Sequence, residues 1–157
     1  MPGKNTRKSH GFSLLEMMLV VVIIGLIAAI AIPRMSRGAA GAGDSALTGS
    51  LWVLRDALDR YAAEHGGAYP TVANFNAAIT TYTDASGATS ATRDTTHIYG
   101  PYIRQVPPLP VGAAKGNTGV AAAAGTGIGW IYDATNGNIS ANTTTEADAT
   151  GKLYNTY

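Results

Sequence analysis

The side chains that could carry catalytic or metal chemistry are few in this chain of 157 residues, and they are scattered. Cysteine is absent, which excludes a disulfide scaffold, a cysteine-ligated metal centre and a thiol nucleophile. The three histidines are His10, His65 and His97, and no two of them have the spacing of metal ligands. Asp133 and Asp148 could form a catalytic carboxylate pair, but isolated surface acids are far more common. We therefore expect no enzyme and no metal centre on these residues.

The overall charge does not favour a nucleic-acid partner. The 11 lysines and arginines are balanced by 10 acidic residues, which leaves a formal net charge of +1. Binding driven by phosphate contacts needs a pronounced basic excess. We therefore expect no nucleic acid among the partners of this chain.

One acidic residue stands out because of its surroundings. Glu16 immediately precedes residues 17–32, a run of sixteen that contains no polar side chain. A carboxylate inside a lipid-facing helix costs about 2.5–3.5 kcal/mol at the bilayer centre and less near an interface. Either Glu16 lies near the cytoplasmic surface of a membrane and stays hydrated, or another chain supplies a positively charged partner for it.

The apolar run is long enough to cross a membrane as a helix. Residues 12–32 would rise roughly 31 Å at about 1.5 Å per residue, which matches the thickness of a hydrocarbon core. Residues 1–11 carry three basic residues and no acid, so we expect the amino end to stay in the cytoplasm. We predict a transmembrane segment over residues 12–33, with the rest of the chain on the far side. A cleavable signal peptide is the alternative, but its apolar core would be shorter.

Residues 34–157 are expected to form a separate soluble headgroup that contains an amphipathic helix. Pro33 either ends the first helix or kinks it, and the glycine- and alanine-rich residues 38–43 are predicted to be flexible. Asp44 then offers an N-cap for a helix over residues 44–65. The apolar side chains of this helix recur at spacings of three and four residues, which places them on one face: Leu47, Leu51, Leu54, Leu58 and Tyr61.

The ends and the exposed face of this second helix also have recognisable signals. Gly66 and Gly67 are a stop signal. Opposite charges lie four residues apart on the exposed side, at Arg55–Asp59 and Asp56–Arg60. The apolar face must be covered by the rest of the chain. We therefore predict an α+β fold in which a long N-terminal helix, half transmembrane and half amphipathic, packs on a small antiparallel β-sheet.

The remaining residues contain one clear hairpin. Residues 129–139 are predicted to form two strands joined at Asn136-Gly137, a pair that favours a type I′ turn. Because side chains alternate between the two faces of a strand, Trp130 and Tyr132 should share one face. Outside the hairpin we predict a short helix near Phe75, irregular backbone over residues 99–109, and loops elsewhere. The predicted loops are residues 83–97, a mobile stretch at 112–127 and a loosely ordered ending at 143–157.

The amino-terminal residues resemble a known family. The basic leader, Gly11, the sequence Phe12-Ser13-Leu14-Leu15-Glu16-Met17-Met18 and the unbroken apolar run are similar to the class III signal of type IV pilins and pseudopilins. The resemblance implies a pilin-like fold and a leader, residues 1–11, that prepilin peptidase removes between Gly11 and Phe12. It also implies N-methylation of Phe12 and pairing of Glu16 with the N-terminal ammonium of a neighbouring copy during filament assembly.

Residues in the second half of the chain narrow this resemblance to one group within the family. Gly100-Pro101-Tyr102-Ile103 and the hairpin ending in Ala141-Asn142 are similar to major pseudopilins of type II secretion systems. This implies a structural subunit of a secretion pseudopilus, held in the inner membrane with a periplasmic headgroup and then built into a filament. The implied partners are other copies of the chain, prepilin peptidase, an assembly ATPase, inner-membrane platform proteins and minor pseudopilins.

Two alternatives to a secretion pseudopilus stay open. The first is a type IV pilus subunit used for adhesion, motility or DNA uptake, although the absence of cysteine argues against the common pilins with a disulfide-closed C-terminal loop. The second is a membrane-tethered ligand-binding domain that never polymerises.

Calcium is the one cofactor that the resemblance brings into question. Many major pseudopilins bind calcium through an acidic, glycine-rich C-terminal loop. The late acids here are only Asp133, Glu146 and Asp148, whereas calcium takes six to eight oxygen ligands. We expect no cofactor, with a calcium site completed by carbonyls and asparagine side chains as the alternative.

Overall fold

A computed structural model describes residues 12–157, with side chains described for residues 12–30 and 41–157. The predicted leader, residues 1–11, lies outside the described residues. The chain divides into two compact units, Met1–Gly38 and Ala39–Tyr157, which we call the N-terminal and the C-terminal unit. Among the residues that the structure describes, no helix combines the length and the apolar character needed to cross a membrane.

Helix α1, Leu14–Glu64, runs through both units without a break in its secondary structure. The prediction that residues 38–43 are flexible is wrong, because they belong to this helix, as does position 33. The predicted N-cap at Asp44 is wrong for the same reason, since Asp44 lies inside α1, and the neighbouring Ser45 and Thr48 are helical residues as well. Their hydroxyls donate to the carbonyl oxygens four residues earlier, at 3.0 and 3.1 Å, as they do inside a helix. The alanines that alternate with these glycines favour helix strongly enough to offset the glycine cost.

The end of α1 follows the predicted stop signal. The helix ends at Glu64, one residue before the predicted boundary. Gly66 has a φ of 67°, and the N–H of Gly67 donates to the carbonyl oxygen of Ala62 at 2.7 Å. This is the hydrogen bond of a Schellman motif that spans five residues, and the motif requires a left-handed conformation at the position of Gly66.

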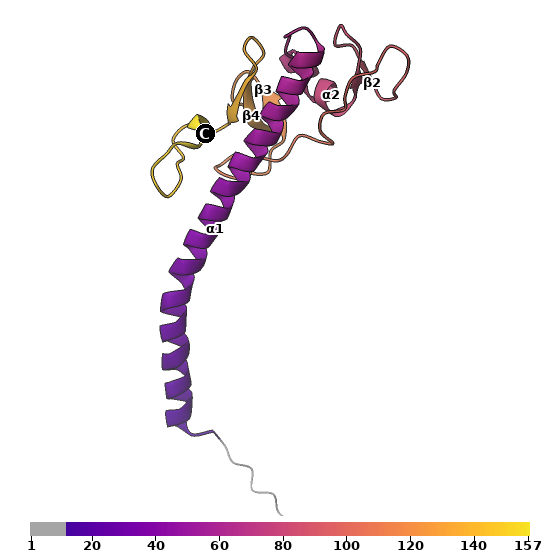
Figure 1. Cartoon of the computed structure of the whole chain (residues 1–157). Helices are drawn as coiled ribbons and strands as arrows, with labels where there is room; N and C mark the ends of the chain where they lie inside the picture. The colour runs from indigo at the N-terminus through magenta and orange to yellow at the C-terminus, as the bar shows by residue number, and fades with distance from the viewer. Residues whose placement is uncertain (1–11) are drawn as a thin grey trace, which may run out of the picture. The chain divides into compact units, whose positions relative to one another are not determined.

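A three-stranded sheet packs beside the C-terminal part of α1 (Figure 1). Its strands are β3, Gly119–Ala121, β4, Ile128–Asp133, and β5, Asn138–Ala141, in the order β3-β4-β5. β4 and β5 form the predicted antiparallel hairpin, in which Trp130 is opposite Ala141 and Tyr132 is opposite Ile139. β3 pairs with β4 in parallel, and it lies inside the stretch 112–127 that was predicted to be a mobile loop. That prediction is wrong for β3.

The turn between β4 and β5 differs from the predicted type I′ turn. Asp133 and Asn138 are the last paired residues, so the loop has four residues rather than two. Gly137 has a φ of 72°, but no non-glycine residue in the described chain has a positive φ, so Asn136 does not adopt the conformation that type I′ requires. The N–H of Gly137 donates to the carbonyl oxygen of Asp133 at 2.9 Å and closes the wider loop.

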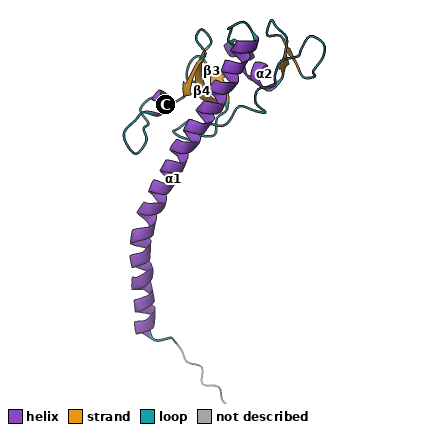
Figure 2. Cartoon of the chain, viewed as in Figure 1, coloured by secondary structure: helices purple, strands orange, loops and turns teal. Residues whose placement is uncertain are grey.

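The elements that connect α1 to the sheet are short. A 3₁₀ turn, Val72–Asn74, leads into α2, Phe75–Thr80, which is the predicted short helix. β1, Tyr82–Thr83, and β2, Thr89–Ser90, form a small antiparallel pair that, except for Tyr82, lies in the stretch 83–97, so the loop prediction is wrong for these strand residues. Much of the C-terminal unit outside these elements is loop (Figure 2).

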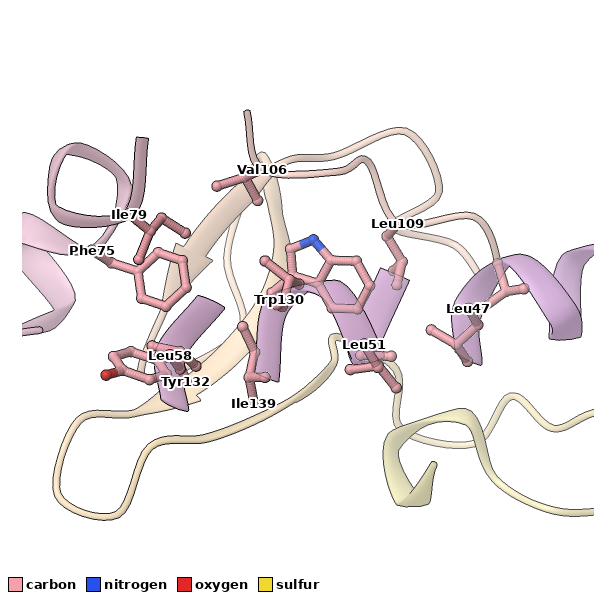
Figure 3. Packing of buried hydrophobic residues seen from close by; sticks show 13 residues of the cluster. Leu47, Leu51, Leu58, Phe75, Ile79, Val106, Leu109, Trp130, Tyr132 and Ile139 are labelled. Carbon is pink, nitrogen blue, oxygen red and sulfur yellow. The ribbon is translucent and has the colours of Figure 1, made fainter. Parts of the chain in front are cut away.

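The core of the C-terminal unit lies between α1, α2 and the inner face of the sheet (Figure 3). The predicted helical stripe is fully buried there, which confirms the pattern read from the sequence. The indole N–H of Trp130 donates to the carbonyl oxygen of Pro107 at 2.8 Å, and the hydroxyl of Tyr132 donates to that of Pro70 at 2.9 Å. Each buried aromatic therefore satisfies its polar group by holding a loop against the sheet.

The ending, residues 143–157, is more ordered than predicted. Ala147 and Leu153 form an antiparallel bridge, and a second 3₁₀ turn covers Tyr154–Thr156. Tyr154 and Tyr157 pack against the core cluster. The low apolar content of this segment suggested loose order, but two aromatic rings and a set of polar contacts are enough to fix it.

Candidate assembly site

The N-terminal unit exposes an apolar surface on all sides. We call its described residues 12–30 the apolar arm. Every large apolar side chain of the arm is at least 44% exposed, and Phe12 is 74% exposed. These side chains are Phe12, Leu14, Leu15, Met17, Met18, Leu19, Val20, Val21, Val22, Ile23, Ile24, Leu26, Ile27 and Ile30. A helix that is apolar all round is buried in lipid or among other helices, since burying each such side chain contributes about 1.5–3 kcal/mol.

The predicted assembly residues lie at the start of this arm. Phe12 and Ser13 precede α1, and the N–H of Met17 donates to the carbonyl oxygen of Ser13 at 3.1 Å in the first turn. Glu16 belongs to that first turn and is exposed. A carboxylate at this position interacts favourably with the helix dipole, by about 0.3–1 kcal/mol. Gly11, the predicted residue before the cleavage site, lies outside the described residues.

Among the described side chains, no ion pair involves Glu16. The ion pairs formed by the described side chains are Arg60–Asp56, at 2.9 Å, and His97–Asp94, at 2.8 Å. The carboxylate of Glu16 is exposed, and it is surrounded by apolar side chains that favour contact with other apolar surfaces.

The histidines of the C-terminal unit have structural partners. The ring nitrogens of His65 lie 2.7 Å from the carbonyl oxygen of Tyr61 and 2.9 Å from that of Asp84, so the ring bridges the end of α1 and the loop after β1. The carboxylate of Asp94 accepts hydrogen bonds from the backbone N–H groups of His97 and Thr96, and these bonds hold the pKa of Asp94 well below its usual range. Among the described residues no group of three or more histidines and acids could hold a metal ion.

Arg55 has a role that the sequence pattern missed. We predicted a surface pair with Asp59, but its guanidinium donates to the carbonyl oxygens of Ile139, at 3.2 Å, and Tyr157, at 2.7 Å. Arg55 thus joins α1 to β5 and to the C-terminal segment. The available signal was its place beside the buried stripe, between Leu51 and Leu58, where a long side chain can reach across the edge of the core.

A family model matches the part of the sequence that contains the apolar arm. Residues 6–32 match the family model described as the prokaryotic N-terminal methylation motif. No solved structure matches the chain.

Several relatives that share one name match a larger part of the chain than the family model does. It is 30% identical to the type II secretion system core protein G of Aeromonas hydrophila, over 68% of this chain and 70% of that protein. It is 37% identical to the protein of the same name from Vibrio cholerae, over 43% of this chain and 46% of that protein, and 29% identical to that from Klebsiella pneumoniae, over 68% and 72%. The methylation motif and these relatives together show that the chain belongs to the type II secretion system core protein G family.

Proposed function

We propose that this chain is the structural subunit of a type II secretion pseudopilus, in which copies pack arm to arm into a helical filament that supports protein secretion. The observation that carries the proposal is an arm exposed on every face, with one carboxylate, Glu16, in its first turn. The relatives, which are all named as core proteins of this secretion system, support the same role. The role is mechanical and requires no catalytic group.

The pairing of Glu16 explains why an acid stands in this arm. When arms pack against each other, the carboxylate loses its water, and an unpaired buried charge costs several kcal/mol. Cleavage between Gly11 and Phe12 would create an ammonium group on Phe12, which loses its water in the same way. A pair formed between the ammonium of one copy and Glu16 of the next satisfies both charges. Because apolar side chains alone allow several axial positions, this pair also sets the axial register of the copies.

The maturation and location of the chain follow from this assignment. We place the precursor in the inner membrane as a single-pass protein, with residues 12–33 in the membrane and the C-terminal unit in the periplasm. Prepilin peptidase would cut before Phe12 and methylate the new amino group. An assembly ATPase and inner-membrane platform proteins would drive polymerisation, and minor pseudopilins would join the same filament.

Substitution of Glu16 tests this proposal. Glu16→Gln keeps the size and the hydrogen-bonding capacity of the side chain but removes its charge. We expect the variant to be cleaved before Phe12 and to remain in the membrane, with few or no filaments and with loss of enzyme export. Mass spectrometry of the mature amino terminus, electron microscopy of sheared filaments and an export assay measure these three properties separately.

The matched control is Asp59→Asn, which neutralises an exposed acid on the same helix, in the C-terminal unit. It should assemble and support export normally. Filaments of normal abundance from Glu16→Gln would contradict the pairing, and a mature chain that begins elsewhere than Phe12 would contradict the maturation. Loss of twitching or DNA uptake with normal export would indicate a type IV pilus instead.

A further inference from the structure

The acids of the C-terminal unit do not form a set of calcium ligands. Calcium takes six to eight oxygen atoms, usually with several carboxylates among them. Asp133 is the last residue of β4, and its carboxylate accepts the N–H of Thr135 at 2.9 Å. The buried side-chain oxygens without a hydrogen-bond partner belong to Asp44, Thr83, Thr143 and Asn155 in the described part of the chain, and only one of them is a carboxylate. This donor set is poor for calcium.

The carboxylate of Asp148 is already occupied by donors of its own segment. One oxygen, Oδ1, accepts the N–H of Thr150 at 2.7 Å, the hydroxyl of Thr150 at 2.7 Å and the N–H of Lys152 at 3.0 Å. The other oxygen, Oδ2, accepts the hydroxyl of Tyr157. A cation that took Asp148 as a ligand would have to displace several of these bonds.

Glu146 joins the C-terminal segment to the loop that precedes β3. Its carboxylate accepts the backbone N–H of Ala113, in the loop that precedes β3, and its own carbonyl oxygen accepts the N–H of Tyr154 at 3.0 Å. The acid that would be the obvious partner of Asp148 in a metal site therefore faces a backbone donor instead.

The end of the segment is tied to α1. Arg55 donates to the carbonyl oxygen of Tyr157 at 2.7 Å, and the amine of Lys152 lies 4.0 Å from the centre of the Tyr157 ring. The ring of Tyr157 therefore receives a cation on its face and contacts the core, while its hydroxyl reaches Asp148.

From these contacts we infer that residues 143–157 are closed onto the C-terminal unit by the carboxylates of Glu146 and Asp148, together with Arg55 and Tyr157, in a way that does not require calcium. The two carboxylates that a calcium-binding loop would use as ligands act here as hydrogen-bond acceptors. This closure is testable whether or not the chain polymerises.

Proteolysis at Lys152 measures the opening of this segment. Lys152 is exposed, but its backbone N–H and C=O are both hydrogen-bonded to Asp148, so cleavage after it requires local unfolding. The full chain in detergent is digested with a lysine-specific protease that needs no metal, in a chelator and in millimolar calcium. We expect the two rates of cleavage at Lys152 to agree within about twofold. Asp148→Asn, which removes the charge and keeps the shape, should raise the rate about tenfold in both conditions, since charge-assisted hydrogen bonds are the strong ones.

Two controls keep the result decisive. The fluorescence of Trp130, which is fully buried in the core, should be unchanged by Asp148→Asn and reports that the rest of the unit is folded. Tyr157→Phe keeps the ring and removes only the hydroxyl, so it should also speed cleavage at Lys152. This variant tests the same hydrogen bond if Asp148→Asn does not fold. The inference would be overturned if the unsubstituted chain were cleaved at Lys152 more than about twofold faster in chelator than in calcium. It would also be overturned if both variants were cleaved at the same rate as the unsubstituted chain.

Discussion

Gly137 allows a quantitative test of how the β4–β5 loop meets Tyr69, in the segment that follows α1. A Cβ atom at this position would lie 2.4–2.7 Å from three atoms of the Tyr69 ring, and φ at Gly137 is 72°. Gly137→Ala therefore incurs two costs. The left-handed conformation costs about 1–2 kcal/mol for a residue with a Cβ atom, and displacement of a packed ring costs about 1–3 kcal/mol. We expect the variant to lower the free energy of unfolding by about 2–5 kcal/mol.

The two costs can be separated with a control glycine. Gly116 has a φ of 91°, but a Cβ atom there would meet nothing within 4 Å, so Gly116→Ala should lose only the conformational part. Urea unfolding of the full chain, followed by the fluorescence of the buried Trp130, measures both variants. Equal losses for the two variants would refute the close approach to Tyr69, and no loss in either would refute the left-handed conformations themselves.

Four further measurements test other contacts. Leu51→Ala, in the buried stripe, should lower the free energy of unfolding by about 2–5 kcal/mol in urea, whereas Trp52→Ala, whose ring is 67% exposed, should change it by less than about 0.5 kcal/mol. His65→Ala should cost about 1–3 kcal/mol in the same assay, because it removes the buried ring that stacks on Tyr61 and joins the end of α1 to the loop after β1. The hydrogen bond between Tyr157 and Asp148 lowers the pKa of Asp148 and raises that of Tyr157 to about 12. Near-ultraviolet circular dichroism should therefore show the C-terminal segment loosening as the pH falls below about 4, and again as it rises from about 10 towards 12. Tyr157→Phe should reduce the alkaline change.

The parts of the fold that depend on local periodicity could be predicted from the sequence. The spacing of Leu47, Leu51, Leu54 and Leu58 identified the buried face of α1, and the alternation around Trp130 and Tyr132 identified the inner face of the hairpin. Both patterns work because burial on one face of an element repeats with the period of that element.

The parts that depend on distant partners could not be predicted. β3 is a three-residue strand of small side chains, and only its parallel pairing with β4 makes it a strand. Asn136-Gly137 usually indicates a two-residue turn, but here the loop widens where Gly137 approaches Tyr69. The segment 143–157 is fixed by carboxylate hydrogen bonds and by Arg55, and such contacts leave no periodic pattern in a sequence. For the assembly site, the motif over residues 6–32 carries the prediction of Gly11, Phe12 and Glu16, which stays a prediction because the proposed partner of Glu16 would belong to a second copy.

The opposite burial of the two units has a consequence for how variants act. The C-terminal unit buries its stripe of leucines, Trp130 and Tyr132 within one chain, so its hydrophobic core is formed by a single copy. The apolar arm buries none of its large side chains within the chain, so its burial must come from lipid or from other copies. Substitutions in the arm should therefore change assembly without changing the unfolding of the C-terminal unit. Substitutions such as Gly137→Ala should act the other way and reduce filament yield only through the fraction of folded subunits. Measuring unfolding and assembly on the same set of variants separates a defect in the proposed Glu16 pair from a general loss of folded protein.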